Sequence, residues 1–486
     1  MKKYLLMLIA LVLVAVMAAP SFAVELKYGG MFRARLQSSD NVVDGTDDGD
    51  GFDNDDDDNQ NYIDQRLRMY FTFVSSENLQ VVTKWEADTR WGNETGGRHG
   101  GGDVGADAVN LEMKNVYVDF AIPTTPVRAT VGIQGISAFT GGWIAEDDFS
   151  AAVAAAKFDP IKVTLGYIGA QNTDVTDTNE NVDDVYLKLD YASGPFKAGL
   201  TGFYQYGHGT DVSVDRFTFI GNGTNTGSGG GPYDQDRFDD NHLFDLGLSL
   251  EYKDSLWSAY VNFVKNLGTV DDDGSGSDDM DYEGWMVDAG GNLYCGPFTF
   301  SLFGFVASGD DKVEDNSVVD FRDLDNQDGF FRYPAGASHY WSEIVGLGTL
   351  DLAVGGGGSD DRADDNVGWA GADSPSNLWT VSAGFAWQAL EGTKLTLNYY
   401  YMATVEDAVT EGVIVRDGTG SRDGQVVVFD TGNEIGHELD MYIDQKIVDK
   451  LSLRLVGAYL FTGDAYSVHE DEDDAYELGA QLLWSF

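Results

Sequence analysis

Apolar and polar residues alternate with a period of two along much of this chain. Residues 26–36 are one example: one face carries Leu26, Tyr28, Phe32, Ala34 and Leu36, and the other carries Lys27, Met31, Arg33 and Arg35. The pattern recurs in segments of about ten to thirteen residues, and a helical period of 3.6 does not fit them. These segments therefore predict β-strands with one apolar face.

The connections between these segments alternate between short and long. The short ones are 75–78, 123–126, 159–160, 192–195, 253–255, 390–392 and 448–450, and the long, acidic ones are 38–61, 92–110, 207–241, 267–281, 308–377, 406–433 and 462–474. A barrel in an outer membrane has short turns at one end and long loops at the other. We therefore predict an all-β fold, a transmembrane antiparallel β-barrel of 16–18 strands. The lower number applies if the weak segments near 150–157 or 285–305 are divided differently.

The N-terminus predicts export. Lys2 and Lys3 precede an apolar run from Tyr4 to Ala18, and Ser21 and Ala23 are small residues at the −3 and −1 positions of a cleavage site. We expect residues 1–23 to be a cleaved signal peptide and residues 24–486 to form a single barrel domain. No later stretch has the roughly 18 unbroken apolar residues of a spanning helix.

Charge separates the connections from the strands. The formal net charge is −51, from 81 acidic and 30 basic residues, which excludes nucleic acid as a natural partner. An arginine that faces lipid costs about 2–4 kcal/mol at mid-membrane, so basic residues in strands are expected to face the lumen. Eleven of them fall on the polar faces of the first half of the chain: Lys27, Arg33, Arg35, Arg66, Arg68, Lys84, Arg90, Arg128, Lys162, Lys188 and Lys197.

The connection at 136–152 differs from the other long ones. It combines Phe139, Trp143 and Ile144 with the acidic cluster Glu146, Asp147 and Asp148. Because its apolar side chains need burial, we expect it to fold into the lumen as a constriction loop, with its carboxylates facing the arginines. The connection 308–377 also contains an apolar stretch, "YWSEIVGLG", which indicates local structure of its own.

Calcium is the one ion that the acidic connections suggest. Carboxylates at the spacing of a calcium loop occur at Asp44, Asp48 and Asp55, and again at Asp323, Asp325 and Asp328. Plain solvated acidic loops explain the same residues, and no other cofactor is expected. The six histidines are scattered, and no hydrolase or zinc-protease motif occurs, so no enzyme activity is predicted.

The chain resembles the bacterial trimeric general porins of the outer membrane. The residues that carry this resemblance are "YGGMFRARL", "QRLRMYF", the acidic third loop and the last strand "YELGAQLLWSF", which ends in Phe486. More narrowly, "MKNVYVDFAIP", "HYWSEIVGLG" and "GHELDMYIDQKI" are similar to the homotrimeric porins of sulfate-reducing bacteria. Two departures are a third loop without the "PEFGGD" wording of enteric porins and a segment count above sixteen.

The resemblance implies a location in the outer membrane of a Gram-negative bacterium and a homotrimer. Its implied partners are membrane lipid, lipopolysaccharide and the barrel-assembly machinery, which would recognise the C-terminal strand. In these porins basic wall residues face an acidic inward loop. That role would pass here to Arg33, Arg35, Arg66, Arg68 and Arg128, against Glu146, Asp147 and Asp148.

We therefore expect a water-filled channel for passive diffusion of ions and small hydrophilic solutes. Two alternatives remain open at this point. The basic residues on the polar strand faces favour a channel specific for an oxyanion or organic acid, and the acidic loops favour a calcium-binding structural surface barrel.

Overall fold

The computed structural model describes most of the chain from Val24 onward. The described residues are 24–42, 59–93, 100–105, 109–172, 181–208, 238–272, 280–309, 318–320, 331–334, 339–346, 348–350, 375–406, 409–415, 425–430, 433–464 and 474–486. The expected signal peptide, residues 1–23, lies outside them. Among the described residues, no helix is long and apolar enough to cross a membrane.

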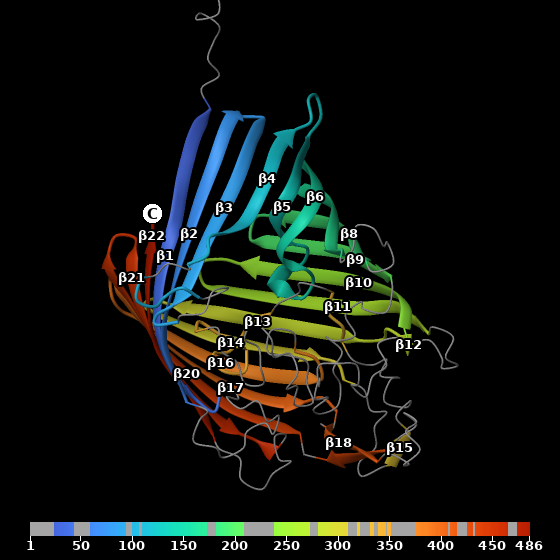
Figure 1. Ribbon diagram of the computed structural model, residues 1–486, viewed down its shortest axis with the longest axis vertical. Coiled ribbons are helices and arrows are strands. Elements are labelled where there is room, and N and C mark those ends of the chain that lie inside the picture. Colours follow the sequence, from blue (N-terminus) through green and yellow to red (C-terminus); the bar gives the residue numbers. More distant parts are fainter. Residues whose placement is uncertain are drawn as a thin grey trace, which may run out of the picture.

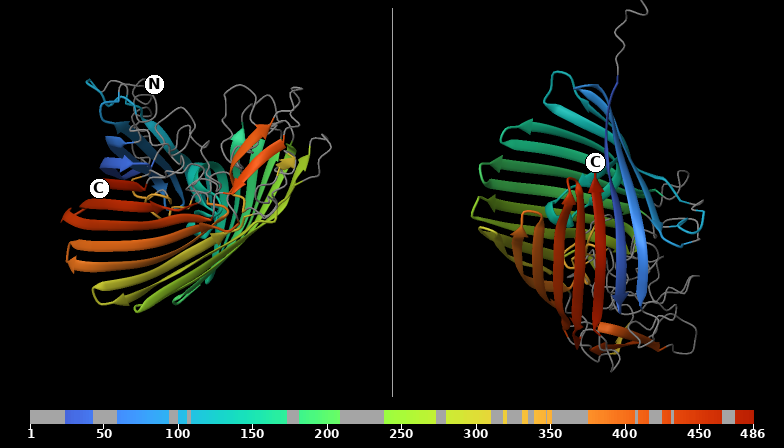
Figure 2. Two further views of the ribbon diagram at one scale, coloured as in Figure 1. Left: turned by 90° about the horizontal axis from the view of Figure 1, so that it is seen from below. Right: turned by 90° about the vertical axis from the view of Figure 1, so that its left-hand side faces the viewer.

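One antiparallel sheet closes on itself to form a barrel (Figures 1 and 2). It has 19 strands, of which β12 is only two residues long, so eighteen long strands remain among the described residues. The strands of the barrel are β1 (Glu25–Asp40), β2 (Gln60–Ser76), β3 (Leu79–Arg90), β4 (Glu112–Ala121), β5 (Val127–Ser137), β6 (Glu146–Phe158), β7 (Ile161–Asn172), β8 (Asn181–Ser193), β9 (Phe196–His208), β10 (Phe238–Lys253), β11 (Trp257–Asp272), β12 (Met280–Asp281), β13 (Trp285–Cys295), β14 (Phe298–Ala307), β16 (Leu378–Leu390), β17 (Thr393–Thr404), β20 (Glu434–Val448), β21 (Leu451–Thr462) and β22 (Ala475–Ser485).

The predicted sorting of the connections is confirmed. Short turns such as 77–78, 159–160 and 194–195 join the strands at one end, and the long connections join them at the other. The number of long strands is eighteen rather than sixteen, because the weak segments form three separate strands, β6, β13 and β14. Their small residues and glycines had blurred the alternation, but each pairs over its length with both neighbours.

The outer surface of the barrel is apolar. On β10, the side chains of Leu246, Leu248 and Leu250 point outward and are 41–46% exposed, whereas Leu243, Asp245 and Gly247 face the interior. Tyr28, Trp257, Trp387 and Trp484 are exposed at strand ends, where membrane barrels carry their aromatic girdles. The alternation read from the sequence therefore matches an apolar outer face toward lipid, whereas the inner face carries both polar and buried apolar residues.

The ring closes between its first and last strands. β1 pairs with β2 on one side and with β22 on the other. At the closure, the backbone N–H of Phe486 donates to the carbonyl of Gly30 at 3.0 Å, and the N–H of Gly30 donates back at 3.1 Å. A Cβ at Gly30 would lie 2.3 Å from the carbonyl oxygen of Arg68 and 2.6 Å from the Phe486 ring. Glycine is needed here because the terminal aromatic ring occupies that space.

A second, smaller sheet and one short helix complete the described elements. The sheet has the order β15 (Val318–Asp320), β19 (Gln425–Asp430), β18 (Val409–Val415), and these strands belong to two of the long connections. The 3-10 helix η1 (Thr140–Gly142) lies between β5 and β6. Figure 1 shows that helix within the barrel, in front of the strands of its middle part.

Candidate functional site

The tip of the β5–β6 hairpin, residues 134–149, leaves the barrel wall. The pairing of β5 with β4 ends at Ile133–Val116, and that of β6 with β7 ends at Ser150–Gly169, whereas β5 and β6 stay paired up to Ser137–Glu146. Phe139, Trp143 and Ile144 in this tip are at most 1% exposed. The inward-folded constriction loop predicted from these apolar residues is confirmed.

Distant strands hold the hairpin tip in place. The indole Nε1 of Trp143 donates to Asp288 Oδ2 on β13 at 3.0 Å, and Thr201 Oγ1 on β9 donates to the carbonyl of Ala138 at 3.0 Å. A Cβ at Gly247 on β10 would lie 2.7 Å from the Phe139 ring, so the tip packs directly on the backbone of that strand. The tip is therefore fixed against strands β9, β10 and β13.

A second inward insertion comes from the connection 308–377. We call its described parts, residues 331–334, 339–346 and 348–350, the crossing segment. Its backbone at Arg332 bonds both ways with the Asn266 side chain of β11, at 2.7 and 3.0 Å. At its other end the carbonyl of Thr349 accepts from Arg35 on β1 at 3.0 Å, and Leu350 packs on Gly479 of β22. The segment thus runs along the inner wall from β11 to β1.

Glu438 on β20 anchors the middle of the crossing segment. Its carboxylate accepts hydrogen bonds from the Ser342 hydroxyl at 2.9 Å and from the backbone N–H groups of Ile344 at 2.7 Å and Val345 at 3.1 Å. Glu438 and its neighbour Asp440 are fully buried. These inward carboxylates therefore bind protein backbone rather than line open water.

The two insertions meet inside the lumen. The rings of Trp143 and His339 stack with centroids 3.9 Å apart, and Tyr333 stacks on the same indole at 6.1 Å. His339 Nδ1 lies 2.6 Å from the carbonyl oxygen of Gly141, and burial lowers the pKa of this histidine. A neutral imidazole with its proton on Nδ1 satisfies that contact.

Arginines line the lumen on strands β1, β2 and β3. Arg35 makes a forked contact with Asp64 at 2.8–3.1 Å, and Arg66 makes one with Asp88 at 2.6–2.9 Å. Arg68 bonds Glu86. Each carboxylate sits directly opposite its arginine in the strand register. We call these three strands, with their inward charged residues, the basic wall.

The basic wall keeps a positive excess despite this pairing. Arg33 lies directly opposite Arg66, so two like charges are neighbours across the strands. Seven basic and four acidic residues share the inward faces, a formal charge of +3 (seven minus four): Lys27, Arg33, Arg35, Arg66, Arg68, Lys84 and Arg90 against Glu25, Asp64, Glu86 and Asp88.

The acidic cluster of the tip lies at a different place from the one expected. Glu146, Asp147 and Asp148 begin strand β6 and are not part of a loop. Asp148 accepts from Asn115 Nδ2 at 2.6 Å and lies 3.6 Å from Lys84 Nζ and 4.0 Å from Lys114 Nζ. It therefore faces lysines of β3 and β4, because the arginines have carboxylates closer by on their own wall.

Arg128 is separated from the other arginines. It is the second residue of β5, next to the short turn 122–126, and pairs with Asp119 at 2.5 Å, near the end of the barrel where the short turns lie. Its place is a mouth of the lumen rather than the level of the two insertions.

Several residues of the lumen were missed from the sequence. Asp288, His339 and Glu438 were given no role from the sequence, since each acts through a partner far away in the chain. The usable signal was the apolar stretch "YWSEIVGLG", whose Ile344 and Val345 are buried in the lumen.

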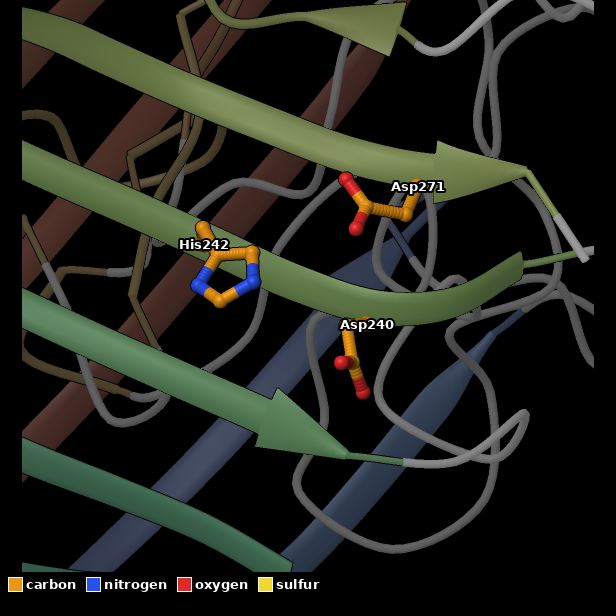
Figure 3. Close-up of side chains that lie close together, drawn as sticks. All are labelled: Asp240, His242 and Asp271. Carbon is orange, nitrogen blue, oxygen red and sulfur yellow. The ribbon is translucent and has the colours of Figure 1, made fainter.

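The calcium ligands suggested by the sequence lie outside the described residues: Asp44, Asp48, Asp55, Asp323, Asp325 and Asp328. Among the described residues, the group that could hold a metal ion is Asp240, His242 and Asp271, at the ends of β10 and β11 (Figure 3).

Several solved structures are similar to this chain at low sequence identity. OpdK of Pseudomonas aeruginosa, solved with vanillate, is 11% identical, with a TM-score of 0.49 over 95% of this chain and 98% of that one. OccAB4 of Acinetobacter baumannii is 9% identical, with a TM-score of 0.49 over 96% and 99%. A loop L8 deletion mutant of OmpT, an outer membrane protein of Vibrio cholerae, is 11% identical, with a TM-score of 0.40 over 95% and 100%. No family model matches the chain. No curated protein matches it either.

The physical features of the chain lead to one conclusion. A closed ring of strands satisfies its backbone hydrogen bonds internally, its outer face is apolar, and its interior holds charged side chains, a buried apolar cluster and two insertions. An eighteen-stranded barrel is too wide for wall side chains to fill. The chain is a transmembrane β-barrel of the outer-membrane type.

Proposed function

We propose that this barrel is a channel for small solutes and that it selects anions, organic acids or oxyanions, over cations and neutral molecules. The observation that carries the proposal is the basic wall, with its formal excess of three positive charges facing the two insertions. Guanidinium groups suit carboxylate and oxyanion ligands because their planar N–H donors match two oxygens at once.

The geometry supports a path along the basic wall. The part of the wall from β11 to β20 carries the inward side chains of Asn266, Asp288 and Glu438, and these form hydrogen bonds with the insertions. An anion would therefore pass between the insertions and Arg33, Arg66 and Arg68, beside Arg35, which holds the end of the crossing segment at Thr349. Glu146, Asp147 and Asp148 would bound this passage at the tip. Arg128 would act earlier or later, at the mouth beside the short turns.

Pairing with carboxylates prepares the arginines for this role. Asp64 and Asp88 each hold one edge of a guanidinium group, which fixes its plane before a solute arrives. A fixed donor loses less conformational entropy on binding than a free side chain. The pairing also keeps anion binding weak enough for release, as conduction requires.

General passive diffusion is the second candidate. It is favoured by the resemblance to general porins and by the acidity of the long connections, which would attract cations to that mouth. Under this alternative the two insertions would only set a size limit.

A planar bilayer measurement separates the two. The purified full-length protein is inserted, and the reversal potential is recorded in a KCl gradient, followed by titration with a dicarboxylate or phosphate. Anion preference and block of the chloride current at millimolar or lower solute are expected. Cation preference without block would contradict the selective channel and support general diffusion.

Oligomeric state and partners extend the proposal. We propose a homotrimer with a cleaved signal peptide, on the strength of the porin resemblance and the N-terminal pattern. Lipopolysaccharide would surround the apolar belt, and the strand ending in Phe486 would be the segment that the assembly machinery reads. The mass of the detergent-solubilised assembly and the N-terminal sequence of the mature protein test these points.

A further inference from the structure

Three metal-ligating side chains gather on the outer face of the barrel. Asp240 and His242 lie two residues apart on β10, and Asp271 lies near the end of β11 (Figure 3). One donor atom from each lies within 4.8 Å of the others. Their neighbours Asn241, Leu243 and Asp245 are buried and face the lumen, so Asp240 and His242 point outward. His242 is paired across the strands with Thr269, whose hydroxyl donates to Asp271 at 3.3 Å, so Asp271 shares that outer face.

The group stands at the edge of the membrane belt. Going along β10 toward the long connections, the outward residues are Leu250, Leu248, Leu246, Phe244, His242 and Asp240. An apolar run is thus followed by an aromatic residue and then by two metal-ligating side chains. This order places the group where hydrocarbon gives way to the aqueous surface on the side of the long connections. All three residues are half-buried, so ions in water reach them.

A tyrosine orients the imidazole. The Tyr204 hydroxyl lies 2.8 Å from His242 Nδ1, and the Tyr206 ring lies 5.0 Å from the imidazole. A histidine that ligates a metal through one nitrogen usually holds its other nitrogen in a hydrogen bond, which fixes the ring. With Nδ1–H donating to the Tyr204 oxygen, the lone pair of Nε2 is available for an ion.

We propose that Asp240, His242 and Asp271 bind a divalent cation of the zinc type at the outer rim of the barrel. One imidazole nitrogen with two carboxylates is a donor set that suits zinc and its neighbours, whereas calcium prefers oxygen ligands alone. In a tetrahedral zinc site with bonds of about 2.0–2.1 Å, donors lie about 3.3 Å apart. The donor atoms lie within 4.8 Å of one another, so a side-chain rotation would bring them to that spacing, and water would complete the coordination.

The barrel carries a matched control for this site. His437 on β20 also points outward, with the Tyr399 hydroxyl at Nδ1 and the Tyr401 ring 5.0 Å away. Its Nε2, however, already pairs with Glu434 at 2.9 Å, and the group of three ligands does not recur there among the described residues. Both histidines therefore have a tyrosine hydroxyl at Nδ1 and a second tyrosine ring nearby. Only His242 belongs to a described group with two carboxylates.

Isothermal titration with zinc chloride tests the proposal. The full-length protein carries no histidine tag, is stripped of metal with a chelator in detergent, and is checked for folding by heat-modifiable gel mobility. His242→Ala and Asp271→Asn should each lower zinc affinity by about tenfold or more, whereas His437→Ala should leave it unchanged. Equal zinc binding by wild type and His242→Ala overturns the proposal. Binding of calcium but not zinc by the wild type also overturns it. Where a variant fails to fold, protection of His242 from diethyl pyrocarbonate by zinc in the wild type gives the same decision.

Discussion

The indole nitrogen of Trp143 reaches Asp288 on the far side of the lumen, at 3.0 Å. This bond joins the hairpin tip to strand β13, 145 residues later in the chain. Trp143→Ala removes both the bond and the stacked ring between the two insertions. Loss of a buried tryptophan costs about 3–5 kcal/mol in a packed core, so we expect the tip to leave its place and the single-channel conductance to rise. Trp387→Ala, on the lipid face, is the control and should leave conductance unchanged.

Glu438 should control whether the crossing segment stays docked. Glu438→Ala leaves the Ser342 hydroxyl and two backbone N–H groups without their acceptor. Each buried group left unpaired costs about 1–3 kcal/mol, so the segment should detach at least part of the time. Limited proteolysis of intact cells or proteoliposomes should then cut within 339–350. Asp449→Asn, in an exposed short turn, should not create this cleavage.

The arginines of the basic wall should set ion preference. A unit charge about 6 Å from an ion in water changes its energy by about 0.7 kcal/mol, a factor of about three in local concentration. Arg66→Gln with Arg68→Gln removes two such charges, so the ratio of anion to cation permeability should fall several-fold, and less at high salt. Lys197→Gln, whose partner Glu251 is near a short turn, is the comparison. An unchanged reversal potential in the double variant would rule out this role.

His339 should make the docked state depend on pH. Burial lowers the pKa of His339 in the folded protein. The stability that the neutral ring contributes is therefore present above the ordinary histidine pKa of about 6.5. It is lost as the pH falls from there toward the lower pKa of the folded state. Asp288, which lies close to the same ring, opposes this shift. Current fluctuations should therefore increase between pH 7 and pH 5. His339→Phe keeps a stacked ring and should abolish the response, whereas His437→Phe should keep it.

Gly30 should be required for closing the barrel. A side chain there would meet the Arg68 carbonyl and the Phe486 ring. Gly30→Val should lower the yield of heat-modifiable, folded barrel in outer membranes. Gly199→Val is a useful second variant, because the atoms nearest its Cβ would belong to the Ser249 and Asp190 side chains rather than to the backbone. Equal yields of Gly30→Val and wild type would show that the closure tolerates a side chain.

Sequence periodicity predicted the wall of this barrel much better than its contents. The wall follows from alternation, since every second residue of a strand such as β10 must suit lipid. The outward direction of Leu246 and Leu248, and the inward one of Arg33 and Arg35, could therefore be read directly. The strand count was uncertain only where glycine and alanine weakened the contrast, in β6 and β13.

The partners of the arginines were harder to predict. Asp88 and Glu86 were visible on the polar face of their strand, but a pairing register is needed to set Arg66 opposite Asp88. Without that register the acidic cluster at 146–148 looked like the natural counterpart. The crossing segment was harder still, because its contacts join positions such as Thr349 and Arg35, 314 residues apart. Alternation within a strand carries no information about such pairs.

The crossing segment also has a mechanical meaning. An eighteen-stranded barrel without insertions would be easily flattened, since each strand touches only its two neighbours. Asn266, Glu438 and Arg35 stand at three places around that ring and are tied by one stretch of chain. Such a connection between three points of the wall restricts the cross-section of the barrel to one shape. Lateral pressure from the membrane would then change the shape of the pore less than in a barrel without such a tie.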